Sequence, residues 1–200
     1  MQQSPPASTD AGVAASALRA IRRYLPAALF AAIVALPAQA GTLSRGSAAF
    51  DRGDYVHAAR ELAPLALQGN PKTLGLLGFM HEHGFGVPQA DEAAFDLYCQ
   101  GATQGNPFAQ AMLGLMYDRG HGVHQDFVQA YKWLDLAAAG SRGHARDSFT
   151  RLRDAVASKM SDDEIHIGQR LALSWTPGAP LPPAAEFATG YSVRPLAQGR

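Results

Sequence analysis

The histidines are the first residues of this sequence that could do chemistry, because imidazole nitrogens are common zinc ligands. His81 and His83 stand two residues apart, and His121 and His124 form a second pair. Zinc ligands must converge on one point, commonly from positions i and i+4 of a helix, whereas side chains two residues apart diverge on a helix. We therefore interpret these histidines as turn and surface residues and predict no metal site.

Glycine-rich, acidic and nucleophile motifs give no stronger chemical signal. Segments 84–86 and 120–122 read Gly-x-Gly, but neither follows a predicted strand, and the sequence has no Gly-Lys-Ser/Thr phosphate motif. The acidic run 162–164 fits a helix start, which favours negative charge. The sequence also has no Gly-x-Ser-x-Gly elbow and no His-Glu-x-x-His motif. We predict no catalytic residue and no cofactor, and we do not expect an enzyme.

Charge and cysteine content limit the possible partners. The 200 residues include 17 basic and 17 acidic side chains, and without residues 1–40 the counts become 14 and 16. This balance gives no electrostatic footprint for nucleic acid, so no nucleic-acid partner is expected. Cys99 is the only cysteine, which excludes a disulfide within the chain. Its thiol is either an inert helix residue, which we favour, or a link to a second chain.

Residues 1–40 have the features of a leader followed by a secretory signal peptide. Three arginines between positions 19 and 23 precede the apolar run 25–36, and Ala38-Gln39-Ala40 is a small-x-small cleavage pattern. The run is shorter than the roughly 20 residues that a membrane span needs. We predict cleavage after Ala40, a periplasmic or secreted location and no remaining membrane span. A buried core helix or an uncleaved anchor is the alternative interpretation.

An internal repeat of 36 residues organises the centre of the chain. Residues 71–104 align in register with residues 107–140, and the sequence Gln-Gly-Asn-Pro recurs at 68–71 and 104–107. Asn70 and Asn106 are good helix N-caps, and a proline follows each at the first helical position. Each copy therefore predicts a helix, a Gly-x-Gly-Val turn and a second helix.

Glycines at fixed positions indicate how the two helices of each hairpin pack. Gly78 and Gly114 fall in the middle of the first helix, where glycine costs about 1 kcal/mol relative to alanine. Recurrence at that cost predicts a close approach between helices. Gly84 and Gly120 are expected to end the first helix. Asp126 is expected to cap the second helix of the later copy.

Residues 111–140 (AMLGLMYDRGHGVHQDFVQAYKWLDLAAAG) resemble the Sel-one-like repeat family, a relative of the tetratricopeptide repeat. Residues 76–105 follow the family pattern less closely, with His81, Ala90 and Leu97 in place of its tyrosine, aspartate and tryptophan. The resemblance implies an all-α fold: a right-handed superhelix of stacked antiparallel helix hairpins, which is an α/α solenoid.

The repeat and the resemblance divide the chain into three parts. The solenoid is expected over residues 41–175, with a partial repeat at about 47–70, repeats at 71–105 and 107–141, and capping helices at 142–175. A cap is needed because the last repeat has no neighbour to bury its apolar face. Ser161 and Glu164 are predicted to form a capping box at the last helix. Residues 176–200 are proline-rich and are predicted to be disordered or to act as a ligand segment.

The resemblance also nominates a partner-binding groove on the concave face, which is lined mainly by the first helix of each repeat. Groove positions of the tetratricopeptide fold flank the helical glycine at fixed offsets. Transferred to this sequence, they select four residues in each repeat: Lys72, Phe79, Glu82 and His83, and Phe108, Leu115, Asp118 and Arg119. A core role for Phe79, Phe108 and Leu115 is the alternative interpretation.

These expectations together predict an exported adaptor or regulator in the cell envelope that binds another protein or a peptide. A secreted effector with the same binding role is one alternative. A β-lactam-binding or β-lactam-hydrolysing protein is a second, because some secreted relatives have been linked to that activity. Those relatives carry paired cysteines within each repeat, which this chain does not have.

Overall fold

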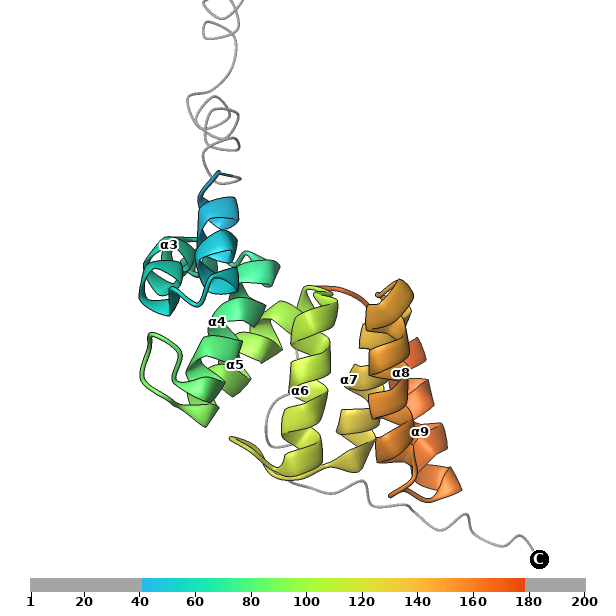
Figure 1. The fold of residues 1–200 in the computed structure, drawn as a ribbon. Helices are drawn as coiled ribbons and strands as arrows, with labels where there is room; N and C mark the ends of the chain where they lie inside the picture. Colours follow the sequence, from blue (N-terminus) through green and yellow to red (C-terminus); the bar gives the residue numbers. More distant parts are fainter. Residues whose placement is uncertain (1–40, 179–200) are drawn as a thin grey trace, which may run out of the picture.

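The computed structural model describes residues 41–178, and every regular element within this range is a helix (Figure 1). The predicted leader and signal peptide, residues 1–40, lie outside the described range, as do residues 179–200 of the predicted tail. The described part of the chain therefore confirms the all-α prediction.

The helices follow one another with short connections. Residues 41–51 are helical and lead into the first labelled helix. The labelled helices are α3 (Tyr55–Leu67), α4 (Pro71–His83), α5 (Asp91–Thr103), α6 (Pro107–Arg119), α7 (Phe127–Ala139), α8 (Gly143–Ala157) and α9 (Asp162–Leu173).

The 36-residue period extends beyond the two repeats that the sequence made evident. Helices α4, α6 and α8 begin at residues 71, 107 and 143, while α3, α5 and α7 begin at 55, 91 and 127. The final helix, α9, begins at residue 162, one residue ahead of the period. The partial first unit and the C-terminal unit are thus built on the same template as the central repeats.

The predicted helix starts are confirmed by their capping hydrogen bonds. The side chain of Asn70 accepts from the backbone N–H of Thr73, and that of Asn106 accepts from the N–H of Ala109, at 3.2 and 2.9 Å. Asp126 caps α7 in the same way, whereas Ala90 makes no side-chain cap for α5. These bonds satisfy amide groups that have no partner within the first turn of a helix.

Close packing of the two helices within each hairpin explains the mid-helix glycines. A Cβ atom added to Gly78 would lie 2.7 Å from the ring of Tyr98, and one added to Gly114 would lie 2.8 Å from Cγ of Leu134. Both distances are shorter than carbon atoms tolerate, so the hairpins α4–α5 and α6–α7 depend on glycine at these positions. The predicted close approach is confirmed.

The second glycine of each Gly-x-Gly turn makes a contact that the sequence did not reveal. Gly86 lies against the backbone of Tyr55 at the start of α3, and Gly122 lies against the backbone of Asp91 at the start of α5. Both glycines have a positive φ, near +69° and +68°. The turn of one repeat therefore packs on the first residue of the second helix in the preceding unit.

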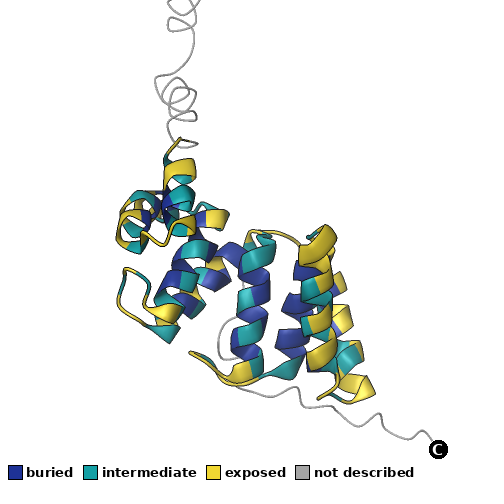
Figure 2. Ribbon diagram, viewed as in Figure 1, coloured by how far each residue is buried: buried dark blue, intermediate teal, exposed yellow. Residues whose placement is uncertain are grey.

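Buried residues are dark blue in Figure 2, and among the described residues the buried apolar side chains fall into two clusters. Helix α6 packs on both α4 and α5, and α7 packs on both α8 and α9. The largest fully buried side chains of the central repeats include Trp133, Tyr98 and Met116. One cluster joins the first unit to α4 and the larger one joins α5, α6, α7 and α8, so packed layers of helices enclose the apolar side chains, as in an α/α solenoid.

The last helix, α9, begins with the capping box predicted from the sequence. The hydroxyl of Ser161 accepts from the N–H of Glu164, while the Glu164 carboxylate accepts from the N–H of Ser161, which confirms the capping box. Beyond α9, the chain turns back across the stack. Trp175 meets Trp133 edge to face at 6.1 Å between ring centroids, and the N–H of Gly178 donates to the carbonyl of Thr103 at 2.7 Å.

Candidate partner-binding surface

The predicted groove residues lie on one face of each of two packed helices. Lys72, Phe79 and His83 are seven and four residues apart on α4, which places them on the same side of that helix. Their repeat equivalents on α6 are Phe108, Leu115 and Arg119, each 36 residues later, and α4 packs against α6. We call these six residues the strip. Its aromatic and leucine side chains are half-buried, whereas its lysine, histidine and arginine are exposed.

Phe79 is the centre of a cluster of rings that joins the strip to the first unit. Its ring centroid lies 4.1 Å from His83, 6.2 Å from Phe108 and 5.9 Å from Phe50. Phe85, in the turn after α4, lies 5.9 Å from Phe79 and stacks on Tyr55 at 4.5 Å. Ring pairs at these distances stabilise the packing by more than the burial of their surface area alone. Sequence reasoning found three members of this cluster and missed Phe50, Tyr55 and Phe85.

Glu82 does not project freely from the strip, because it joins two repeats. Its carboxylate accepts a hydrogen bond from the hydroxyl of Tyr98 at 2.8 Å and lies 3.9 Å from the guanidinium of Arg119. The Glu82 side chain is only 12% exposed, while that of Arg119 is 50% exposed. Burial, together with the nearby Glu82 carboxylate, raises the pKa of Tyr98, so this hydroxyl remains a hydrogen-bond donor.

Asp118 repeats this arrangement one unit later. Its carboxylate lies 2.7 Å from the ammonium group of Lys159, which follows α8, and its side chain is 15% exposed. Each acid at this repeat position therefore pairs with a cation supplied by the following unit. Among the described residues, Lys72 makes no ion pair, so the strip offers a cation that is open to a ligand.

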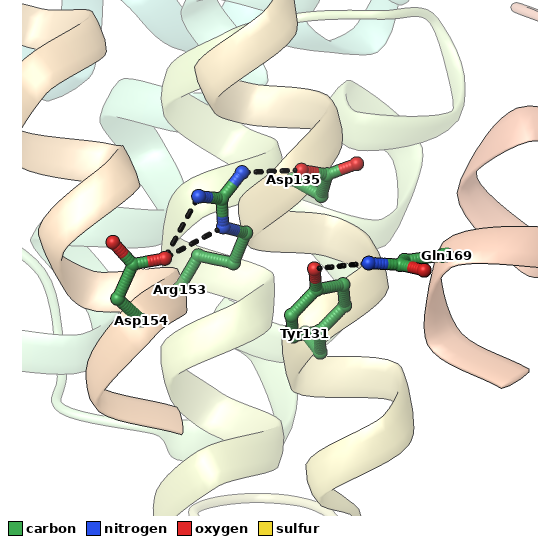
Figure 3. Close-up of polar contacts among 5 residues, drawn as sticks. All are labelled: Tyr131, Asp135, Arg153, Asp154 and Gln169. Carbon is green, nitrogen blue, oxygen red and sulfur yellow. Dashed lines mark hydrogen bonds and ion pairs between the residues drawn. The ribbon is translucent and has the colours of Figure 1, made fainter. Parts of the chain in front are cut away.

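A polar junction holds the C-terminal helices against the last full repeat (Figure 3). The guanidinium of Arg153 on α8 reaches Asp135 of α7 at 2.8 Å and Asp154 at 2.7 Å. The amide of Gln169 on α9 donates to the hydroxyl of Tyr131 on α7 at 3.3 Å. These contacts position the cap and lie outside the strip.

Lys132 on α7 is a buried lysine, with its ammonium group 4.3 Å from the ring centroid of Trp133. Burial lowers its pKa to about 8. In the unfolded chain an ordinary lysine holds its proton to about pH 10.4. Below pH 8 both states are protonated, so the folded state carries the full cost of burying the charge. That cost falls as the pH rises from 8 to about 10.4.

Replacing this lysine, Lys132→Met, is therefore expected to stabilise the protein by about 1–3 kcal/mol at pH 7, because methionine fills similar space without a charge. The gain should shrink toward zero by about pH 10.5. Urea denaturation of both proteins at pH 7, 9 and 10.5 measures the difference. A destabilised variant at pH 7 would show that the cation–ring contact outweighs the cost of burial.

The remaining candidates for chemistry are the single thiol and the possible metal ligands. Cys99 is buried, and burial, together with Asp96, raises the pKa of its thiol to about 12, which disfavours the reactive thiolate. Within residues 41–178, no group of three or more His, Cys, Asp or Glu side chains is arranged to hold a metal ion. No helix in the same range is long and apolar enough to cross a membrane.

Stacked helix hairpins with a strip of side chains across their first helices define a helical-repeat protein of the tetratricopeptide-like class. Residues 74–106 and 107–141 match the model of the Sel1 repeat. These two matched segments coincide with the two copies whose sequence resembles the Sel-one-like repeat family, so the resemblance is confirmed for this part of the chain. Sel1 repeats generally mediate protein–protein interactions, and the family is typically a non-catalytic scaffold. No curated protein sequence matches the chain significantly.

Two solved structures share this fold. A protective antigen of uropathogenic Escherichia coli strains, c5321, displays an SLR fold and is 24% identical, with a TM-score of 0.61. A Sel1 repeat protein from Oxalobacter formigenes is 28% identical, with a TM-score of 0.52. The similar region covers 67% and 66% of this chain but only 29% and 53% of those chains. The chain therefore spans part of the length of either neighbour.

Proposed function

We propose that this protein is an exported adaptor or regulator of the cell envelope, and that it binds a peptide or helix of another protein along the strip. The observation that carries the proposal is the half-buried row of apolar side chains on α4 and α6, where Phe79, Phe108 and Leu115 retain exposed surface. Aromatic anchors with a polar rim are typical of surfaces that bind polypeptides.

The polar groups around the strip suit a binding role. Lys72 and His83 are exposed at opposite ends of the α4 face, and Arg119 is exposed at the end of the α6 face. Glu82 and Asp118 are held by cations of the following units, so Glu82 joins α4 to α6 and Asp118 joins α6 to the residues after α8. Export rests on the signal-peptide features of residues 1–40 alone.

Alanine substitution separates a binding role from a core role. Phe108→Ala and Phe79→Ala are each expected to weaken partner binding at least tenfold, because a buried aromatic anchor at an interface is worth about 2 kcal/mol or more. The partner is captured with residues 41–200 as bait, and its affinity for each variant is measured by titration calorimetry.

The control is Phe95→Ala. Phe95 is also half-buried, but it lies on α5 against Tyr117 and outside the strip. The control is expected to lower the melting temperature at least as much as Phe108→Ala while leaving the affinity unchanged. Equal affinity losses in all three variants would show that these phenylalanines act only through stability.

A secreted effector remains the second candidate, because the same surface would serve a partner in another cell. We do not propose a β-lactam-directed activity, since Cys99 is the single cysteine of the chain. Turnover of a chromogenic β-lactam by the purified chain would contradict the non-enzymatic proposal.

A further inference from the structure

The residues that follow α9 end at the turn between α5 and α6, where the described part of the chain stops. The N–H of Gly178 donates to the carbonyl of Thr103 at the end of α5, at 2.7 Å. A Cβ atom on Gly105 would lie 3.7 Å from the Pro177 ring. Residues 176–178 are thereby fixed at the turn between α5 and α6, three residues before Phe108.

The first turns of α4 and α6 meet at this same place. A Cβ atom on Gly101 would lie 3.1 Å from the carbonyl oxygen of Pro71, and one on Gly75 would lie 3.1 Å from the ring of Phe108. The first turns of α4 and α6, which carry Lys72 and Phe108, therefore pack beside the C-terminal end of α5, to which Gly178 is hydrogen-bonded.

The sequence beyond Gly178 has the chemistry that an aromatic surface binds. Pro180, Pro182 and Pro183 follow within five residues, with Leu181 between them. Such a segment favours the polyproline II conformation, which advances about 3.1 Å per residue, so these prolines can reach about 6–16 Å beyond Gly178. Proline-rich segments bind to aromatic-lined surfaces readily because the segment is already restricted before binding and loses little conformational entropy when it binds.

We propose that residues 180–183 of this chain occupy the Phe108 end of the strip and that a partner must displace them. This inference rests on the proposed function, because it assigns to the strip a preference for proline-rich segments. A covalently attached ligand has a high effective concentration, so even a weak intrinsic affinity would hold it in place. The partner class that fits the same surface is a proline-rich polypeptide.

Site-specific photocrosslinking tests the proposal in the full 200-residue chain. The photoreactive amino acid p-benzoylphenylalanine replaces Lys72, which is exposed and makes no ion pair among the described residues. The matched control carries it at Gln100, which is exposed on α5 one turn before Thr103 and therefore also near the start of the segment. After irradiation of purified protein, mass spectrometry locates the crosslinks.

The expected result is an intramolecular crosslink from position 72 to residues 179–186, with a yield at least fivefold above that from position 100. Replacing all three prolines by glycine (Pro180→Gly, Pro182→Gly and Pro183→Gly) should lower the yield at position 72 at least fivefold, with an unchanged circular dichroism spectrum. Equal yields at the two positions, no effect of the prolines, or a crosslink only between two copies would overturn the proposal.

The same protein expressed in cells separates this inference from the proposed function. If position 72 crosslinks to another protein in cells but never to residues 179–186 of its own chain, the strip binds partners and the self-occupancy proposal is wrong. If position 72 forms no crosslink in either setting, the proposed function fails together with this inference.

Discussion

Replacing Gly122 by alanine is expected to lower the free energy of unfolding by about 3–4 kcal/mol. Gly122 has a φ of +68°, a backbone conformation that costs an alanine about 1–2 kcal/mol. The added Cβ would also lie 2.7 Å from the carbonyl oxygen of Asp91, and backbone atoms at the start of α5 cannot rotate away. Overpacking of this kind adds about 1–3 kcal/mol. Urea denaturation followed by circular dichroism measures the loss.

Gly53→Ala is the matched control for this prediction. Gly53 has a φ of +77°, but no atom lies within 4 Å of the position that its Cβ would take. The control therefore carries the conformational cost without the collision, and it should lose about 1–2 kcal/mol. If the two variants were equally destabilised, the contact between the turn and the preceding repeat would contribute nothing to stability.

Trp133→Ala is expected to lower the free energy of unfolding by about 4 kcal/mol, since removal of a fully buried tryptophan leaves a large cavity. The Trp133 side chain is completely buried, and its ring contacts both Trp175 and the ammonium group of Lys132. Circular dichroism follows unfolding, because fluorescence would change with the lost indole.

Trp175, whose ring contacts Trp133, provides the comparison for this second prediction. Trp175 is only half-buried, so Trp175→Ala should cost less than Trp133→Ala while removing the same edge-to-face contact. The substitution Trp133→Phe should recover part of the loss by filling some of the cavity. A Trp175→Ala variant as unstable as Trp133→Ala would mean that the returning C-terminal segment contributes most of the stability.

Sequence reasoning was most accurate where local chemistry determines local structure. Asn70, Asn106 and Ser161 were identified as helix caps, and each makes the predicted hydrogen bond. The mid-helix position of Gly78 was enough to predict a close helix pair. These features depend on neighbours within a few residues, or on one hairpin, so spacing along the chain contains the information.

Contacts between units were harder to predict, because they depend on how one hairpin sits on the next. In the sequence, a position in the turn is enough to explain Gly86 and Gly122. In the structure, both glycines also pack on the preceding unit. The tetratricopeptide offsets placed Glu82 and Asp118 beside the strip, but offsets do not show that the following unit supplies Arg119 and Lys159 as partners.

The ring cluster shows the same difference within the site. Phe79 and Phe108 share a face because of their repeat positions, which a sequence pattern can show. Phe50, Tyr55 and Phe85 come from a helix end, a helix start and a turn, and no single periodicity relates them. Only the stacking of the first unit on α4 brings them together. Phe, Tyr and Trp are only slightly more frequent at positions 50–85 than elsewhere in the chain, so composition offered no useful signal for this cluster.

The strict spacing of helix starts at 71, 107 and 143 has a consequence for the length of the molecule. Each internal unit has an acid that pairs with a cation of the following unit. Its turn glycine packs on the start of a helix in the preceding unit. A duplicated stretch of 36 residues would meet matching surfaces on both sides. Evolution or a protein engineer could therefore elongate the proposed binding face one helix hairpin at a time without redesigning either terminus.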